Sequence, residues 1–90
     1  VKNVDFKVGG KTKVANVSFN IKNEGLVSLK VYDISGRMIA TLIEDYLSSG
    51  YHSISWNALD DNSVLVSAGV YIYTLKTEES SISRKMILMK

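Results

Sequence analysis

The chain has 90 residues, of which 46% are hydrophobic and 22% charged, with a formal net charge of +2 and no cysteine. This length accommodates one domain with a single core, and the apolar fraction is too high for intrinsic disorder. The small net charge argues against nucleic-acid binding, the lack of cysteine excludes disulfides and thiolate metal sites, and the short apolar runs exclude a transmembrane helix.

Apolar and polar residues alternate with a period of two, which predicts β-strands with one buried face. The alternation is clear at 17–21, 27–31 and 52–56, whereas 70–75 and 82–89 carry apolar residues on both faces. We expect seven strands, at about 3–8, 13–22, 26–33, 37–43, 51–57, 69–77 and 81–89. The segment 40–47 is also compatible with one helical turn.

Turn-forming residues separate the expected strands at intervals of about 8–12 residues. Hairpin-type loops are expected at 23–25, 34–36, 48–50 and 78–81, and one longer connection runs from 58 to 68. This spacing predicts an all-β fold, either a sandwich or a barrel, that forms a single domain over residues 1–90.

Three glycines and one aspartate are expected to shape the loops. Gly36 follows Asp33 in a tight turn, where a positive φ is free of steric cost for glycine. The Asp33 carboxylate is expected to accept hydrogen bonds from backbone amides of that turn. Gly50 and Gly69 stand at strand entries, where the missing Cβ is expected to permit a close approach of the backbone.

Aromatic residues are expected to hold the core. Trp56 is the best candidate for the central anchor, because one indole buries about 150–250 Å². Tyr71 and Tyr73 are expected to pack their rings inside while each hydroxyl finds a backbone partner, as in the tyrosine corner of immunoglobulin-type sandwiches.

No residue set predicts catalysis or metal binding. His52 is the only histidine and shares a strand face with Ile54 and Trp56, which indicates a residue at the core or its edge. Asp60-Asp61-Asn62 offers oxygen ligands but lacks EF-hand spacing, so turn chemistry is preferred to a calcium site.

Adjacent acidic and aromatic residues give no better site. Glu44-Asp45 and Glu78-Glu79 are neighbours whose side chains point apart, and Gly9-Gly10 opens no helix that could bind phosphate. A sugar-stacking platform is not supported, because alternation does not place its candidates on one face: Tyr32, Tyr46, Tyr51 and Trp56. We therefore expect no enzymatic activity, no cofactor and no metal.

Read from residue 26 onward, the chain resembles two related bacterial families. The segment VSLKVYDISGR at 27–37, followed by IATL at 39–42, is similar to a pattern V-x-L-x-V-Y-D-x-x-G-x-x-V-x-T-L. The next three segments of the pattern are matched by SGYHSISW at 49–56, NALDDNSVLV at 57–66 and SAGVYIYTL at 67–75. For 57–66 the family pattern is d-g-x-D-d-n-G-x-x-v. SRKMILMK at 83–90 resembles a basic and apolar ending.

The two families are the C-terminal sorting domain of the type IX (Por) secretion system and the immunoglobulin-like domain of the flagellar hook-capping scaffold. An ending at Lys90, directly after the basic strand, favours the sorting domain. Two features depart from the pattern: the chain has no proline where an Asn-Pro motif usually precedes the second strand, and Ala68-Gly69 replaces Ser-Gly.

This resemblance implies an immunoglobulin-like antiparallel β-sandwich of about seven strands. It further implies a non-catalytic domain that directs a cargo, fused at its N-terminal side, through the type IX machinery to the outside or to the cell surface. A sortase-like peptidase is an implied second partner, and we expect a monomer. The alternatives are an accessory binding or spacer module of a secreted enzyme, or a hook-cap-like assembly domain.

The resemblance also suggests which residues the machinery reads. Recognition is expected to use backbone pairing and side-chain contacts of the terminal strands. The candidate contact residues are Gly69, Tyr71, Lys85 and Lys90, and Asp33 and Gly36 are expected to hold the shape.

Overall fold

The computed structural model describes residues 7–9 and 15–88, and it contains seven strands. Each expected strand is confirmed within the described residues, with bounds that differ by a few residues at most ends. The strands are β1 (Lys7–Gly9), β2 (Ala15–Ile21), β3 (Gly25–Asp33), β4 (Met38–Leu47), β5 (Gly50–Trp56), β6 (Gly69–Lys76) and β7 (Ser81–Leu88).

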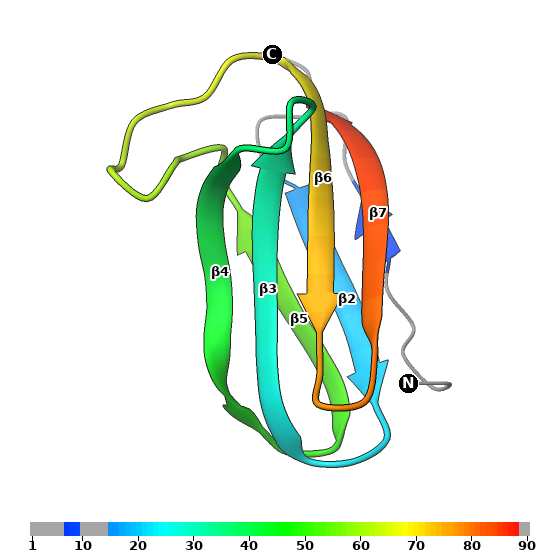
Figure 1. Cartoon of the computed structure of the whole chain (residues 1–90). Helices are drawn as coiled ribbons and strands as arrows, with labels where there is room; N and C mark the ends of the chain where they lie inside the picture. The colour runs from blue at the N-terminus through cyan, green and yellow to red at the C-terminus, as the bar shows by residue number, and fades with distance from the viewer. Residues whose placement is uncertain (1–6, 10–14, 89–90) are drawn as a thin grey trace.

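The strands form two antiparallel sheets packed face to face (Figure 1). One sheet has the order β1-β2-β5 and the other the order β4-β3-β6-β7. This distribution of strands between two sheets is the arrangement of immunoglobulin-like sandwiches. The predicted fold class is therefore confirmed, and no helix in the described part of the chain could span a membrane.

The core lies between the two sheets and consists of inward residues of β2 to β7 together with Ala58. The burial pattern of β3 alternates along its length, as a strand with one covered face requires. The buried apolar residues are Val17, Phe19, Ile21, Val27, Leu29, Val31, Ala40, Trp56, Ala58, Tyr71, Tyr73, Leu75, Met86 and Leu88.

Trp56 is buried in this core, as predicted. Its exposed fraction is 2%, and its ring meets those of Tyr71 and Tyr73 edge to face, with centroids 5.5 and 5.9 Å apart. Because Trp56 belongs to β5 and both tyrosines to β6, the aromatic cluster joins the two sheets. The Nε1 of Trp56 donates a hydrogen bond to the carbonyl of Leu59 at 2.8 Å.

The helical alternative for 40–47 is wrong. These residues continue β4 to Leu47, paired with β3 down to Gly25, and the register shifts between Leu29 and Lys30 and again between Val31 and Tyr32. A bulge changes which face each side chain takes, so the simple alternation disappears from the sequence. The local sequence is compatible with either a strand or a helical turn, and the hydrogen bonds to β3 hold this segment as a strand.

The close-approach role of Gly50 and Gly69 is also wrong. A Cβ built on either residue meets no atom within 4 Å. Their backbones instead have φ of 119° and 153°, which side-chain-bearing residues rarely adopt. Glycine stands at the two strand entries because of these φ values, since a side chain would have room at both positions.

Candidate functional site

Four of the six candidate recognition residues, Asp33, Gly36, Gly69 and Tyr71, gather at one end of the four-stranded sheet. Asp33 pairs with Tyr71 across β3 and β6, Tyr71 with Met86 across β6 and β7, and Gly69 with Leu88. Lys85 precedes Met86 and stands opposite Ile72, near the middle of β7 and beside this end of the sheet. We call this region, made of the 33–37 turn, the beginning of β6 and the end of β7, the turn end. Lys90 lies outside the described residues.

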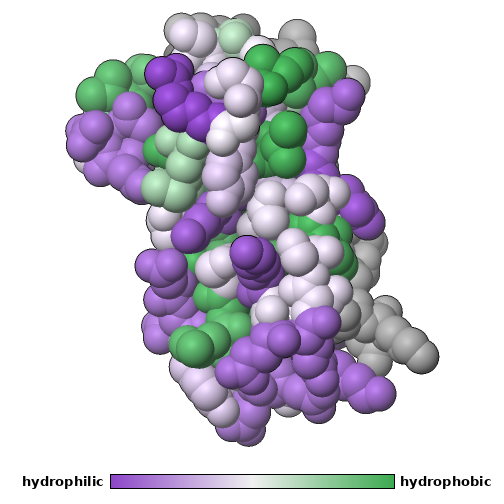
Figure 2. Space-filling view, in the orientation of Figure 1, coloured by the Kyte–Doolittle hydropathy of each residue, from purple (hydrophilic) through white to green (hydrophobic). Residues whose placement is uncertain are grey.

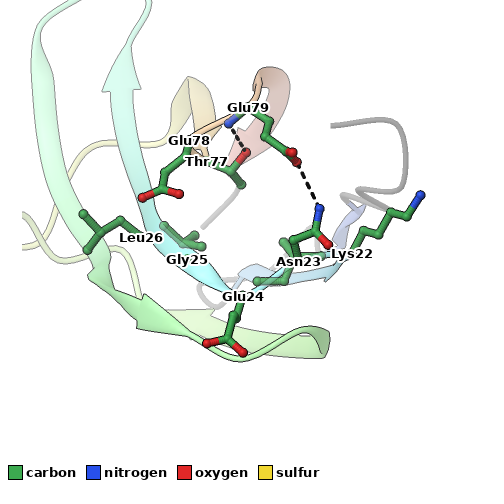
Figure 3. Close-up of a pocket in the computed structure, with 10 residues that line it drawn as sticks. Lys22, Asn23, Glu24, Gly25, Leu26, Thr77, Glu78 and Glu79 are labelled. Carbon is green, nitrogen blue, oxygen red and sulfur yellow. Dashed lines mark hydrogen bonds between the residues drawn. The ribbon is translucent and has the colours of Figure 1, made fainter.

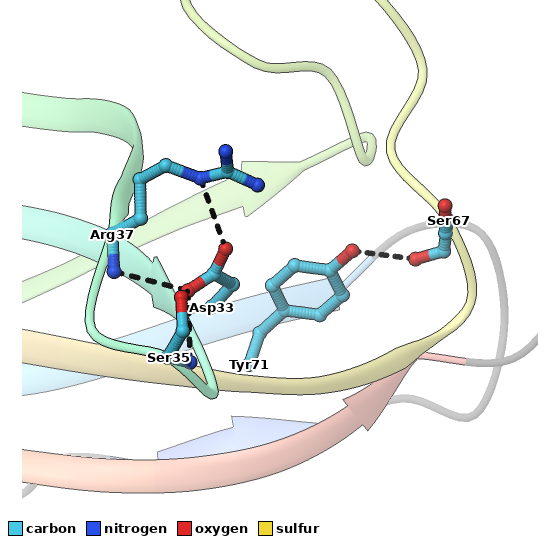
Figure 4. A network of polar contacts seen from close by, with 5 residues as sticks. All are labelled: Asp33, Ser35, Arg37, Ser67 and Tyr71. Atoms are coloured by element: carbon cyan, nitrogen blue, oxygen red, sulfur yellow. Dashed lines mark hydrogen bonds and ion pairs between the residues drawn. The ribbon is translucent and has the colours of Figure 1, made fainter.

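The 33–37 turn is organised by one carboxylate (Figure 4). Asp33 Oδ1 accepts hydrogen bonds from the amides of Ser35 and Arg37, both at 3.0 Å, and from the Ser35 hydroxyl at 2.6 Å. The Gly36 amide donates to the Asp33 carbonyl at 3.0 Å, and Gly36 has a φ of 92°. This is a tight turn closed by a glycine in the left-handed region, with Asp33 accepting from the backbone amides of the turn, as the sequence predicted.

The bonds to this carboxylate favour its charged form. The Ser35 hydroxyl and then the Arg37 amide lower the pKa of Asp33 below its ordinary value. Arg37 Nε also donates to Asp33 Oδ2 at 3.2 Å, which forms an exposed ion pair within the turn. Asp33 therefore acts as the fixed centre of the loop and is occupied on both oxygens.

Tyr71 is a buried positioning residue. Its hydroxyl donates to the Ser67 carbonyl at 2.6 Å, and only 6% of the residue is exposed (Figure 4). Burial first, and then the nearby charge of Asp33, raise the pKa of Tyr71. A tyrosine at the start of this strand that bonds back to the chain four residues upstream is the predicted tyrosine corner. The ring of Tyr73 is fully buried, and burial raises its pKa as well.

Lys85 differs from these residues because it is exposed on the outer face of β7. Among the described strands β7 pairs on one side only, with β6. Arg84 follows the core-facing parity of β7 yet is exposed, which is one way in which natural edge strands resist uncontrolled pairing. The turn end thus combines a sheet edge with an outward cation.

A second turn, at 60–64, repeats the geometry of the 33–37 turn; the sequence predicted a turn here but not its likeness to the 33–37 turn. Asp60 Oδ1 accepts from the amides of Asn62 and Val64 at 2.8 and 2.9 Å, and the Ser63 amide donates to the Asp60 carbonyl at 2.9 Å. This is the turn chemistry preferred for Asp60 to Asn62. In both turns an Asp is followed three residues later by Gly or Ser, as in Asp33 with Gly36 and Asp60 with Ser63. This shared spacing could have revealed the likeness of the two turns.

The next residue of that turn covers an edge of the sheet. Asp61 donates its amide to the Ile39 carbonyl at 3.1 Å and accepts from the Thr41 amide at 3.0 Å through Oδ1. β4 is the edge strand on this side, so Asp61 occupies the position of a neighbouring strand over two residues. This function of the 58–68 connection depends on the tertiary fold.

The remaining candidates for a catalytic or metal-binding role make structural contacts. The His52 ring stacks on Phe19 with centroids 5.6 Å apart, and its Nε2 lies 2.7 Å from the Ser48 carbonyl, at the edge of the core as predicted. Glu44 pairs with Lys30 at 3.6 Å. Over the described residues there is no group of three or more His, Cys, Asp or Glu that could hold a metal ion.

A small pocket opens at the opposite end of the sandwich, between the β2–β3 and β6–β7 loops (Figure 3). Its volume is about 70 Å³, and Asn23 bonds to Glu79 across it at 3.5 Å. Glu24, Glu78 and Glu79 surround it, and Lys22 extends away from it. The pocket admits little more than water, so it is a poor candidate for an organic ligand.

Comparison with known proteins gives one family. The model of the secretion system C-terminal sorting domain matches residues 11–89, which is most of the chain. A search of curated proteins found no match. The matched range includes the whole turn end as far as the structure describes it.

Proposed function

This chain belongs to the family of secretion system C-terminal sorting domains, and from that premise we propose that the turn end is the part that the secretion machinery reads. Domains of this family direct a fused cargo through the type IX secretion system, so the cargo of this chain is secreted or placed at the cell surface. The family is non-catalytic, and we propose the same for this domain.

The strongest support for recognition at the turn end is that residues from distant parts of the sequence lie close together there. Asp33, Gly69 and Lys85 are far apart in sequence and lie on three adjacent strands. The registers bring Asp33 and Gly69 to one end of the sheet and place Lys85 beside it, opposite Ile72. A recognition signal that any cargo can carry must belong to the domain itself. A folded end that combines a rigid turn, a strand edge and a cation meets this requirement.

The residues divide into positioning and contact roles in this proposal. Asp33 and Gly36 hold the turn, and Tyr71 fixes the start of β6 from inside the core. Gly69 allows the strand entry its unusual φ of 153°. Lys85 and the edge of β7 are the groups available for direct contact. Lys90, which lies outside the described residues, is proposed as a further basic contact.

We also propose a sortase-like peptidase as a second partner, which would act after transport. Its cleavage site would lie before the folded sandwich, because removal of the domain requires cutting between cargo and β-strands. Comparing the mass of the secreted cargo from wild-type cells with that from a strain without the peptidase tests this step.

The main test attaches this chain to the C-terminal side of a periplasmic reporter in a bacterium with the type IX system. The reporter is expected in the medium or on the surface, and in the periplasm of a strain that lacks the translocon. The variant Asp33→Ala is expected to retain about tenfold more reporter in the periplasm, because the turn loses its centre.

Asp60→Ala is the matched control, since it removes the same carboxylate from the other turn of the same geometry. Equal retention of both variants would mean that turn stability matters and the turn end does not. Periplasmic retention of the wild-type fusion would contradict sorting by this chain altogether.

A further inference from the structure

Apolar side chains lie open on the outer face of the four-stranded sheet beside the turn end. The register places Met38 beside Tyr32, Tyr32 beside Ile72, and Val70 beside Ile87. Tyr32, Val70, Ile72 and Ile87 alternate with buried residues along their strands and so point away from the core. Met38 is exposed beside Tyr32, across the bulge in β4. Met38 is 47% and Ile87 60% exposed, and the other three are half-buried. We call these five residues the outer patch.

The opposite half of the same face is mainly polar, although Leu26 and its partner Tyr46 are each 58% exposed there. Lys30 pairs with Glu44 at 3.6 Å, and the hydroxyls of Thr74 and Ser83 lie 3.0 Å apart. Figure 2 shows hydrophobic surface over the upper ends of β6 and β7 and mainly hydrophilic surface at the lower end. The same strands therefore present a solvated half and an apolar half, and only the apolar half adjoins the turn end.

One cation accompanies the outer patch. Lys85 stands opposite Ile72 in the β6–β7 register and is exposed. Within the described side chains the ion pairs are Lys30 with Glu44 and Arg37 with Asp33, and neither includes Lys85. An apolar surface with one uncompensated positive charge is complementary to an apolar surface that carries a carboxylate.

We propose that the outer patch, with Lys85, docks onto a protein of the secretion machinery through an apolar surface that bears a carboxylate opposite Lys85. This inference rests on the proposed function and specifies the chemistry of its partner. A protein is favoured over an anionic membrane, because electrostatic membrane binding by this kind of surface takes about 4–8 clustered cations. Tyr32 and Ile72 occupy the centre of the patch, where aromatic and apolar anchors contribute most to an interface.

The test uses the reporter fusion in secreting cells with three substitutions at outward positions of β7. Ile87→Glu and Lys85→Glu each place a negative charge in or beside the outer patch and are expected to lower the secreted fraction about tenfold. Ser83→Glu places the same charge on the same strand in the polar half, and it is expected to leave secretion within about twofold. Lys85→Arg keeps the charge and should restore secretion.

Two measurements separate docking from folding and from the proposed function. Urea unfolding of the purified variants is expected to show equal stability for Ile87→Glu and Ser83→Glu. A photo-crosslinking residue in place of Met38 is expected to join the domain to a tagged outer-membrane component of the machinery, and the same residue in place of Ser81 is not. Normal secretion of Ile87→Glu and Lys85→Glu, with normal wild-type secretion, would overturn the docking proposal and leave the sorting function intact.

Other occupants are tested with purified protein. Binding of the wild-type chain to phosphatidylglycerol vesicles, abolished by Ile87→Glu, would overturn the proposal in favour of a membrane. A dimer in sedimentation equilibrium that Ile87→Glu dissociates would overturn it in favour of a second copy. A wild-type chain that is monomeric and does not bind the vesicles supports docking onto a protein of the machinery.

Discussion

At the residue scale, two loops with the same hydrogen bonds differ in the residue that takes the left-handed conformation. Gly36 has a φ of 92° in the 33–37 turn, whereas Ser63 has a φ of 64° in the 60–64 turn. Ala58, at the start of the same connection, has a φ of 65°. The pattern that 57–66 resembles carries glycine at the places of both Ala58 and Ser63, so this chain holds two strained positions where the pattern has none.

We predict that Ser63→Gly raises the free energy of unfolding by about 0.5–1 kcal/mol, because the relief of left-handed strain exceeds the entropy that glycine adds to the unfolded chain. The urea unfolding midpoint measures the change. Asn62→Gly is the control in the same loop, since Asn62 has no positive φ, and it should not stabilise. A gain from Asn62→Gly equal to that from Ser63→Gly would refute the strain argument.

At the element scale, the two edges of the four-stranded sheet are treated differently. On β4 the Thr41 amide is bonded by Asp61, and the Tyr46 amide is bonded by the carboxylate of Asp45 at 2.8 Å. No described strand pairs with the free side of β7. Covered amides discourage strand addition at the β4 edge, whereas the protection described on β7 is the inward-facing charge of Arg84.

We predict that Asp61→Ala opens the β4 edge. The Thr41 amide should exchange with deuterium faster, and stability should fall by about 1 kcal/mol, because one backbone hydrogen bond is lost. Asp61→Asn keeps an acceptor oxygen and should retain most of the protection. Amide exchange followed by NMR checks both, and unchanged protection at Thr41 in Asp61→Ala would show that the contact contributes nothing.

At the scale of the whole molecule, one aromatic cluster joins the sheets. Trp56 contacts both buried tyrosines of β6 and bonds to the Leu59 carbonyl, so it connects the sandwich core to the 58–68 connection. A chain of this length has a narrow stability margin, typically about 5–15 kcal/mol in total. The sandwich therefore depends strongly on this residue.

We predict that Trp56→Ala lowers the free energy of unfolding by about 3–5 kcal/mol, through lost burial and the cavity that remains. Trp56→Phe, which keeps a ring and loses the bond to Leu59, should cost clearly less. Thermal unfolding followed by circular dichroism distinguishes them. A loss below about 1 kcal/mol for Trp56→Ala would show that the sheets are held together elsewhere.

Part of the turn end could be predicted from local sequence. Asp33 and Gly36 act within a few residues of each other, and Tyr71 bonds four residues upstream, so their roles follow from short-range chemistry. The outer patch could not be predicted, because Tyr32 and Ile72 become neighbours only through the β3–β6 register. The single domain over residues 1–90 stays a prediction.

The sequence by itself determined the strands and their buried faces, because a period of two is a local property of an extended chain whose one face must leave water. Only the tertiary structure decided which strands are neighbours, where β4 is bulged, and that Asp61 covers an edge. These features depend on hydrogen bonds between segments far apart in the chain. Such bonds are decided by the packing of the two sheets as a whole, and no local preference specifies them.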